Sequence, residues 1–377
     1  MRLNFSFPSC SNFVRCSIDG CLSGPEAVVK SLGISGSLLD RFCVGNRASK
    51  PSAMVATRST AILILASFLV VVSGKKAGSN DRPIIGVLSQ EVTEYVNGRY
   101  ENQYNSYIAA SYVKFVEGAG ARVVPIWINK SNDYYEDIMR KINGVLWPGG
   151  ASTFNKKHGY ADAGKKIYKI AKRFNDNGNH FPILGVCLGF ELLTYLTADG
   201  RDDRDNCNAE RISLPLKFED GYRDSNMYRA ITDDLVTILE TKNVTANFHH
   251  FCVTKAGLKR VGIANKLKVL STSRANGTTF VSSVESTEYP FFGVQFHPEK
   301  NLYEWIEGRG IPHDKKAVLV AQYFANFFVN EARKNRQRFE DSDEEVRSLI
   351  YNYPVTYTAQ KNILFQQCYL FKANTTL

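Results

Sequence analysis

Short apolar runs alternate with longer segments of mixed polarity through the first half of residues 75–377. Four runs have the length and β-branched content of buried strands, and they cover residues 83–88, 121–126, 144–147 and 182–186. Apolar positions at helical spacing predict helices between them, over residues 105–119, 134–141 and 161–177. Another helix is expected directly after Cys187. Strands that alternate with helices predict an α/β fold with a mostly parallel central sheet flanked by helices.

The pattern changes after residue 211. Short β-type runs are joined there by turn residues, at residues 244–253, 268–272, 278–284 and 291–297. A helix is predicted over residues 315–334. The tail over residues 349–371 is rich in Tyr and Phe, so we expect it to pack on the body of the protein.

The N-terminal region contains an apolar run at residues 61–72, which is shorter than the roughly 20 residues of a membrane span. Arg58 precedes it, and small residues at 72–74 follow. This order predicts a signal peptide over residues 54–74 that starts at Met54. Residues 1–53 are then an extension of doubtful origin, and residues 75–377 form a single domain. A type II membrane anchor is the alternative, although no stable membrane span is expected from so short a run.

Two further patterns fit the secretory pathway. Asn-x-Ser/Thr sequons provide candidate glycosylation sites, at Asn129, Asn243, Asn276 and Asn374. Four cysteines follow residue 74, which is too few for a disulfide scaffold. If Cys187 stays free, at most one bridge can form among Cys207, Cys252 and Cys368. No metal-ligand spacing such as Cys-x-x-Cys occurs after residue 74.

The chain has 47 basic and 37 acidic residues, a formal net charge of +10. Seven basic and three acidic residues lie in residues 1–74, so the remainder carries +6. This excess fits an ordinary solvated surface, or a field that attracts a polyanionic substrate. Nucleic acid is not an expected partner, because no basic run interleaved with aromatic residues is found.

The strongest motif is Gly185-Val-Cys187-Leu-Gly189, which stands between an apolar strand and a helix. A nucleophile flanked in this way sits on a sharp turn, where bulky neighbours would clash. The N-terminus of the following helix is expected to favour the Cys187 thiolate. A buried, inert core cysteine is the alternative. The strand, the two glycines and the helix together favour a nucleophile.

A second motif, Phe-His297-Pro-Glu299, lies at the end of the run at 291–297. Pro298 favours an extended conformation at His297, and residues two apart in extended chain point the same way. Glu299 is therefore expected to accept a hydrogen bond from His297 Nδ1, which leaves Nε2 for the sulfur. One oxyanion donor is expected to be the backbone N–H of Leu188. The second is expected from the Gly149-Gly150 turn, where Gly150 is the predicted donor.

These residues resemble class I glutamine amidotransferase domains, and more closely the folate γ-glutamyl hydrolase family. The matching segments lie at residues 83–86, 107–114, 118–125, 142–150, 181–191, 245–249, 289–300, 327–335, 350–351 and 365–369. The resemblance implies a lysosomal or extracellular enzyme that cleaves folylpoly-γ-glutamates. It implies no metal, no cofactor and a homodimer. It also makes His249 a second active-site histidine near the substrate and places Glu191 on the helix below the nucleophile, so both are predicted to bind the substrate.

The predicted mechanism is attack by Cys187 on a γ-glutamyl amide, with His297 as acid and base and a γ-glutamyl thioester as intermediate. Two alternatives use the same fold. A glutaminase of the amidotransferase type would pass ammonia to a synthetase, and a secreted binding protein would not catalyse a reaction at all.

Overall fold

The computed structural model describes residues 79–373. The chain divides into two units, residues 1–74 and 75–377, and all described residues belong to the second. The extension at 1–53, the signal peptide at 54–74 and the sequon at Asn374 therefore lie outside the described residues and stay predictions.

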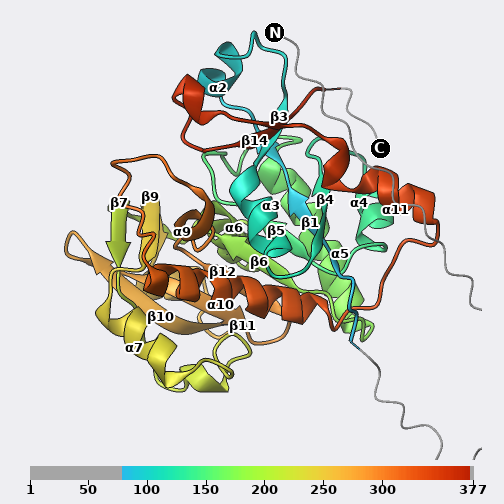
Figure 1. The fold of residues 1–377 in the computed structure, drawn as a ribbon. Helices are drawn as coiled ribbons and strands as arrows, with labels where there is room; N and C mark the ends of the chain where they lie inside the picture. Colours follow the sequence, from blue (N-terminus) through green and yellow to red (C-terminus); the bar gives the residue numbers. More distant parts are fainter. Residues whose placement is uncertain (1–78, 374–377) are drawn as a thin grey trace, which may run out of the picture. The chain divides into compact units, whose positions relative to one another are not determined.

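The centre of the fold is an eight-stranded sheet with the order β4-β1-β5-β6-β12-β11-β10-β8 (Figure 1). The first five strands pair in parallel, and the last three are antiparallel. The strands are β4 (Arg122–Ile126), β1 (Ile84–Leu88), β5 (Val145–Trp147), β6 (Ile183–Val186), β12 (Phe291–Val294), β11 (Thr278–Ser286), β10 (Leu267–Ala275) and β8 (Lys217–Phe218). The predicted mostly parallel sheet is confirmed.

Helices cover both faces of this sheet. One face packs against α3 (Ala110–Glu117) and α10 (Lys315–Ala332), and the other against α4 (Asn132–Met139), α5 (Tyr160–Asp176) and α6 (Leu188–Thr197). Strand β1 shows the reason, because Ile85 and Val87 join the first core while Ile84 and Leu88 join the second. This period of two is what a strand buried on both faces requires.

A small antiparallel sheet corrects the prediction of one helix over residues 105–119. Its strands are β13 (Val355–Thr356), β14 (Cys368–Phe371), β3 (Ser106–Ala109) and β2 (Gln90–Glu91), so the predicted helix begins only at Ala110. Strand β14 comes from the aromatic tail and pairs with β3 along its whole length. The backbone of residues 106–109 is therefore satisfied by a distant segment, a pairing that local periodicity does not reveal. The predicted packing of the tail is confirmed (Figure 1).

A two-stranded ribbon, β7 (Arg204–Leu214) with β9 (Thr245–Val253), stands beside the large sheet. The remaining α-helices of the described range are α2 (Glu94–Gly98), α7 (Asp233–Thr241), α8 (Lys255–Arg260), α9 (Lys300–Tyr303) and α11 (Ser342–Ser348). No helix within residues 79–373 is both long and apolar enough to cross a membrane.

Candidate active site

Cys187 lies in the sharp turn between β6 and α6. Its φ of 51° and ψ of −108° are strained values for a residue with a side chain. A Cβ added to Gly185 would lie 2.4 Å from Gly189 O, and one added to Gly189 would lie 2.1 Å from Trp147 O. Both glycines are thus needed for close backbone packing around the turn, as the motif predicts.

Cys187 and His297 line one cavity of about 820 Å³. Gly150, Leu188 and Glu191 line it as well. The ribbon β7–β9 contributes Phe248 to Phe251, and the tail contributes Ile363 to Phe365. Gly149 lies between the two central side chains, because a Cβ on it would be 2.6 Å from His297 Cε1 and 3.0 Å from Cys187 Cβ. The two motifs, distant in sequence, therefore meet at the ends of β6 and β12.

The expected contact between His297 and Glu299 is present. His297 Nδ1 lies 2.7 Å from Glu299 Oε1, and both side chains are buried. The expected local geometry was wrong, however, because β12 ends at Val294 and Glu299 has the helical φ of −64° that opens α9. A turn, rather than an extended strand, folds the carboxylate back onto the ring. His297 Nε2 is buried and has no hydrogen-bond partner within residues 79–373.

The protonation of Cys187 corrects another expectation. Burial and the carboxylates of Glu191 and Glu299 raise the pKa of the Cys187 thiol, although the Leu188 N–H at the helix N-terminus lowers it. The thiol is thus the resting form, because one helix end does not offset desolvation. Burial also lowers the pKa of His297, against the pull of Glu299. The resting pair is a neutral thiol and a neutral imidazole.

Tyr112 of α3 was not predicted as a site residue. Its Oη accepts a hydrogen bond from Gly149 N at 2.9 Å and lies 3.2 Å from His297 Nδ1. Nothing in the apolar pattern around residue 112 marks it, since it looks like any buried position of an amphipathic helix. Because the Gly149 N–H is occupied, Gly150 and Leu188 remain the predicted oxyanion donors, and both line the cavity.

Glu191 lies one turn along α6 from Cys187 and is buried. Gln295 Nε2 donates to its Oε1 at 3.1 Å, and Arg204 donates to its Oε2 at 3.3 Å. Burial raises the pKa of Glu191 to about 7, although both partners lower it. The family resemblance placed Glu191 beneath the nucleophile, but sequence reasoning did not identify Gln295 or Arg204, which reach it from other elements.

His249 of β9 is buried, with 4% of its surface exposed, so the alternative of a half-exposed strand residue is wrong. Its Nδ1–H donates to Phe251 O at 2.8 Å, and Nε2 lies 3.1 Å from Asn247 Oδ1. Burial lowers its pKa to about 4. His249 lines the cavity, and a role toward the substrate stays a prediction.

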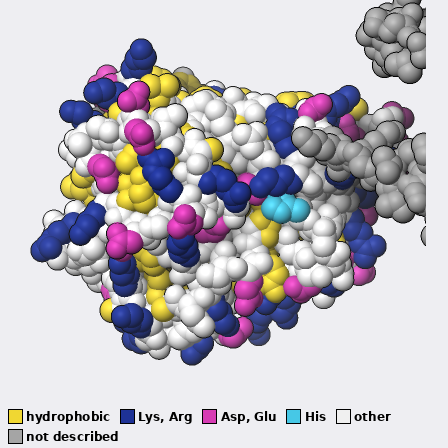
Figure 2. All heavy atoms as spheres, turned by 90° about the horizontal axis from the view of Figure 1, so that it is seen from below, with side chains coloured by type: hydrophobic (Ala, Val, Ile, Leu, Met, Phe, Trp, Pro, Cys, Tyr) yellow, Lys and Arg dark blue, Asp and Glu magenta, His cyan; other side chains and the backbone are white. Residues whose placement is uncertain are grey.

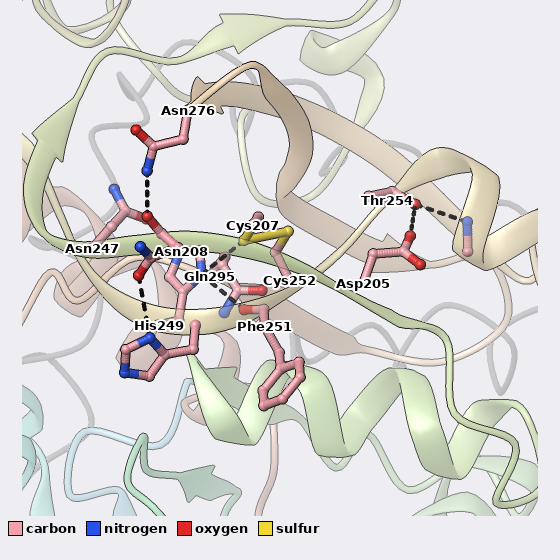
Figure 3. The surroundings of a disulfide bond; sticks show 12 residues. Asp205, Cys207, Asn208, Asn247, His249, Phe251, Cys252, Thr254, Asn276 and Gln295 are labelled. Carbon is pink, nitrogen blue, oxygen red and sulfur yellow. Dashed lines mark hydrogen bonds between the residues drawn. A yellow bond between two sulfur atoms is a disulfide. The ribbon is translucent and has the colours of Figure 1, made fainter.

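One disulfide resolves the open cysteine question. Cys207 of β7 and Cys252 of β9 are bridged, and Cys187 and Cys368 are free and buried. Figure 3 shows the bridge tying the two strands of the ribbon beside His249 and Phe251. The ribbon contributes to the cavity wall, so the bridge restrains that wall.

Three sequons lie on the described surface. Asn129, Asn243 and Asn276 are all exposed, although Asn276 Nδ2 donates to Asn208 O at 2.6 Å (Figure 3). Basic side chains are spread among acidic ones on the face shown in Figure 2. That face fits the ordinary solvated surface.

Residues 83–299 match the protein family described as Peptidase C26. The γ-glutamyl hydrolase of Mus musculus is 42% identical over 296 residues, which cover 78% of this chain and 90% of that protein. The chain belongs to the Peptidase C26 family. Other similar proteins are the γ-glutamyl hydrolase of Homo sapiens, at 40% identity over 77% of this chain and 90% of its own, and γ-glutamyl hydrolase 1 of Arabidopsis thaliana, at 36% over 80% and 86%. The resemblance found from the motifs is confirmed, and this Peptidase C26 member is a cysteine-type hydrolase.

Proposed function

We propose that this enzyme hydrolyses the γ-glutamyl bonds of folylpoly-γ-glutamates, with Cys187 as nucleophile, His297 as general acid and base, and Glu299 as the group that orients His297. The single observation that supports this most is the meeting of the two motifs in one cavity. The Cys187 thiol there is free, and Nε2 of His297 has no hydrogen-bond partner among residues 79–373. The γ-glutamyl hydrolases that resemble this chain support the substrate class.

The first step follows from the resting protonation states. His297 Nε2 takes the proton from the Cys187 thiol as the sulfur attacks the γ-carbonyl carbon. The imidazolium that forms is stabilised by the buried carboxylate of Glu299. Burial opposes the ionisation of Glu299, but its hydrogen bond to His297 and the charge on the protonated ring lower its pKa below the usual range. The charged pair of thiolate and imidazolium therefore forms only when a substrate is attacked.

The remaining steps use the same groups. The N–H groups of Leu188 and Gly150 hold the developing oxyanion, and each such donor contributes roughly 3–4 kcal/mol. His297 gives its proton to the departing amine, and a γ-glutamyl thioester remains. His297 then takes a proton from water, which attacks the thioester and releases Cys187.

We also propose that the enzyme enters the secretory pathway, acts in the lysosome or outside the cell, and forms a homodimer. The exposed sequons at Asn129 and Asn243 and the Cys207–Cys252 bridge support an oxidising compartment. Loss of mass on treatment with an N-glycosidase tests entry into the secretory pathway. The mass in solution, measured by light scattering, tests the homodimer.

Product analysis with a pteroyl pentaglutamate tests the activity. Wild-type enzyme is expected to release glutamate or short polyglutamates, and Cys187→Ala to release none while keeping its circular dichroism spectrum. Near-normal release by Cys187→Ala would sink the proposal. Glutamine as a competing substrate separates a glutaminase from a γ-glutamyl hydrolase. Iodoacetamide labelling of wild type against Cys187→Ala separates a reactive thiol from the buried Cys368.

A further inference from the structure

The glycine turn after β5 is bound from one side by the side chain of Gln90, the first residue of β2. Only 2% of the surface of Gln90 is exposed. Its Nε2 donates to Pro148 O at 2.9 Å and to Gly149 O at 3.2 Å. Its Oε1 accepts a hydrogen bond from Tyr107 Oη at 3.3 Å. The amide nitrogen of Gln90 therefore holds two successive backbone carbonyls.

These contacts fix the direction of the N–H groups in the turn. The peptides of residues 79–373 are trans, so a carbonyl held toward Gln90 turns the N–H of the same peptide away from it. In the first peptide this is seen directly, because Gly149 N donates to Tyr112 Oη, which lies beside His297. In the second peptide, the same rule directs the N–H of Gly150 away from Gln90.

The second of these peptides depends on Gln90 more than the first does. Pro148 O also accepts a hydrogen bond from Tyr160 Oη at 2.7 Å, whereas Gly149 O has no other donor within residues 79–373. A peptide between two glycines rotates with little restriction, since neither residue has a Cβ. Gly150 N donates no hydrogen bond to any residue of the same range, and Gly150 lines the active-site cavity. Its N–H is therefore free for a ligand, and Gln90 sets its direction.

The space on either side of the turn explains why both of its residues are glycines. A Cβ on Gly150 would lie 1.7 Å from Gln90 Oε1, and one on Gly149 would lie 2.6 Å from His297 Cε1. The Gln90 side chain thus fills the space behind the turn, and the imidazole fills the space in front of it. Gln90 itself does not line the cavity.

We propose that Gln90 is a positioning residue that holds the N–H of Gly150 as an oxyanion donor. The inference rests on the proposed function and deepens it, because this donor is used only when a γ-carbonyl carbon is attacked. Gln90 acts through the peptide that joins Gly149 to Gly150. Removing its amide should weaken the binding of the oxyanion and leave the thiol and the imidazole in place.

Two reactions of Cys187 that differ in their need for an oxyanion donor test this proposal. Hydrolysis of the aminobenzoyl diglutamate N-(4-aminobenzoyl)-γ-glutamyl-glutamate forms an oxyanion at the γ-carbonyl. Alkylation by iodoacetamide forms none, because the sulfur displaces iodide from a saturated carbon and the thiol proton passes to His297.

Gln90→Met keeps the length of the side chain and removes its donors. It is expected to lower kcat of hydrolysis roughly 100-fold, as the loss of one oxyanion donor does, with KM changed by less than about threefold. Its rate of alkylation at Cys187, followed by peptide mass spectrometry, is expected to stay within about twofold of wild type.

Gln322→Met is the matched control, because Gln322 Nε2 also donates to a backbone carbonyl, that of Gly118 at 3.3 Å, and does not line the cavity. It is expected to change neither rate. Gln90→Glu keeps the shape of the side chain and so tests the same contact if Gln90→Met does not fold. Burial favours a protonated carboxyl at this position. Because that carboxyl has one donor in place of two, kcat is expected to fall roughly tenfold, with the alkylation rate unchanged.

Equal losses of hydrolysis and alkylation in these Gln90 variants would assign the residue a purely structural role and overturn the proposal. A wild-type kcat in both variants would overturn it as well, whether or not KM changes. If wild type does not cleave the substrate while Cys187 is alkylated, the proposed function itself fails, and the assignment of Gly150 as a donor fails with it.

Discussion

Glu299 is a fully buried carboxylate whose Oε1 lies 2.7 Å from Nδ1 of the ring that it orients. Replacing it by glutamine keeps the shape but removes the charge that stabilises the imidazolium of His297. Glu299→Gln is therefore expected to lower kcat by roughly 10²–10⁴-fold, with little change in KM. Steady-state kinetics on the aminobenzoyl diglutamate measures this.

A change of KM alone would contradict that assignment. Glu288→Gln is the matched control, because Glu288 is exposed near β12. This variant is expected to leave kcat unchanged. The unfolding temperature of both variants should stay close to that of wild type, so that a loss of activity is not a loss of fold.

Individual site residues were predictable only where a local motif marks them. Cys187 and His297 stand in short patterns whose chemistry is visible in a few neighbouring residues. Tyr112 and Gln295 carry no such pattern, because they become site residues only when α3 and the end of β12 pack beside α6.

The elbow between β6 and α6 depends on the close approach of α6 to β5. Gly189→Ala would place a methyl group 2.1 Å from Trp147 O, so the helix must shift. We expect it to lower the free energy of unfolding by roughly 3 kcal/mol and to reduce activity with it. Thermal unfolding followed by circular dichroism measures the effect.

Gly98→Ala is the matched control for that substitution, because nothing lies within 4 Å of the added Cβ. It is expected to be neutral or stabilising by up to about 1 kcal/mol. Equal unfolding temperatures for Gly189→Ala and wild type would show that α6 tolerates the shift, and the tight-turn argument would be wrong.

The ribbon β7–β9 is held by the bridge between Cys207 and Cys252, which are 45 residues apart. A loop of that length predicts a stabilisation of about 4 kcal/mol from the chain entropy of the unfolded state. The double variant Cys207→Ala/Cys252→Ala is expected to unfold at a lower temperature than wild type. Dithiothreitol should lower the unfolding temperature of wild type and leave the double variant unchanged. If it destabilises both equally, the bridge is not the source of the effect.

At the level of elements, the strands and helices of the large sheet were predictable because each has its own apolar period. The pairing of β3 with β14 was not, since it joins the start of the domain to its tail. For the same reason the sequence left the partner of Cys207 open. Register between distant strands is set by the whole fold, and a single segment does not contain it.

At the scale of the whole molecule, the pH dependence of stability reflects buried groups such as Glu191. Its pKa rises from an ordinary 4.5 to about 7 on folding, so the folded state binds a proton more tightly than the unfolded state. The stability that this group contributes is fully present below pH 4.5 and is lost as the pH rises through 7. The loss amounts to at most roughly 3 kcal/mol.

Glu191→Gln removes this titration and keeps a side chain that can contact Gln295 and Arg204. Between pH 5 and pH 8, the unfolding temperature of wild type is therefore expected to fall more than that of the variant. Burial raises the pKa of Asp203 to about 6, so this group changes stability with pH in the same direction as Glu191, and His249 changes it in the opposite direction. Both residues are present in wild type and in the variant, so their effects cancel in the comparison. Glu240→Gln, an exposed change in α7, should follow wild type. If the unfolding temperature of Glu191→Gln falls as much as that of wild type, the Glu191 carboxyl does not titrate between pH 5 and pH 8. Its partners then hold it ionised over this whole range.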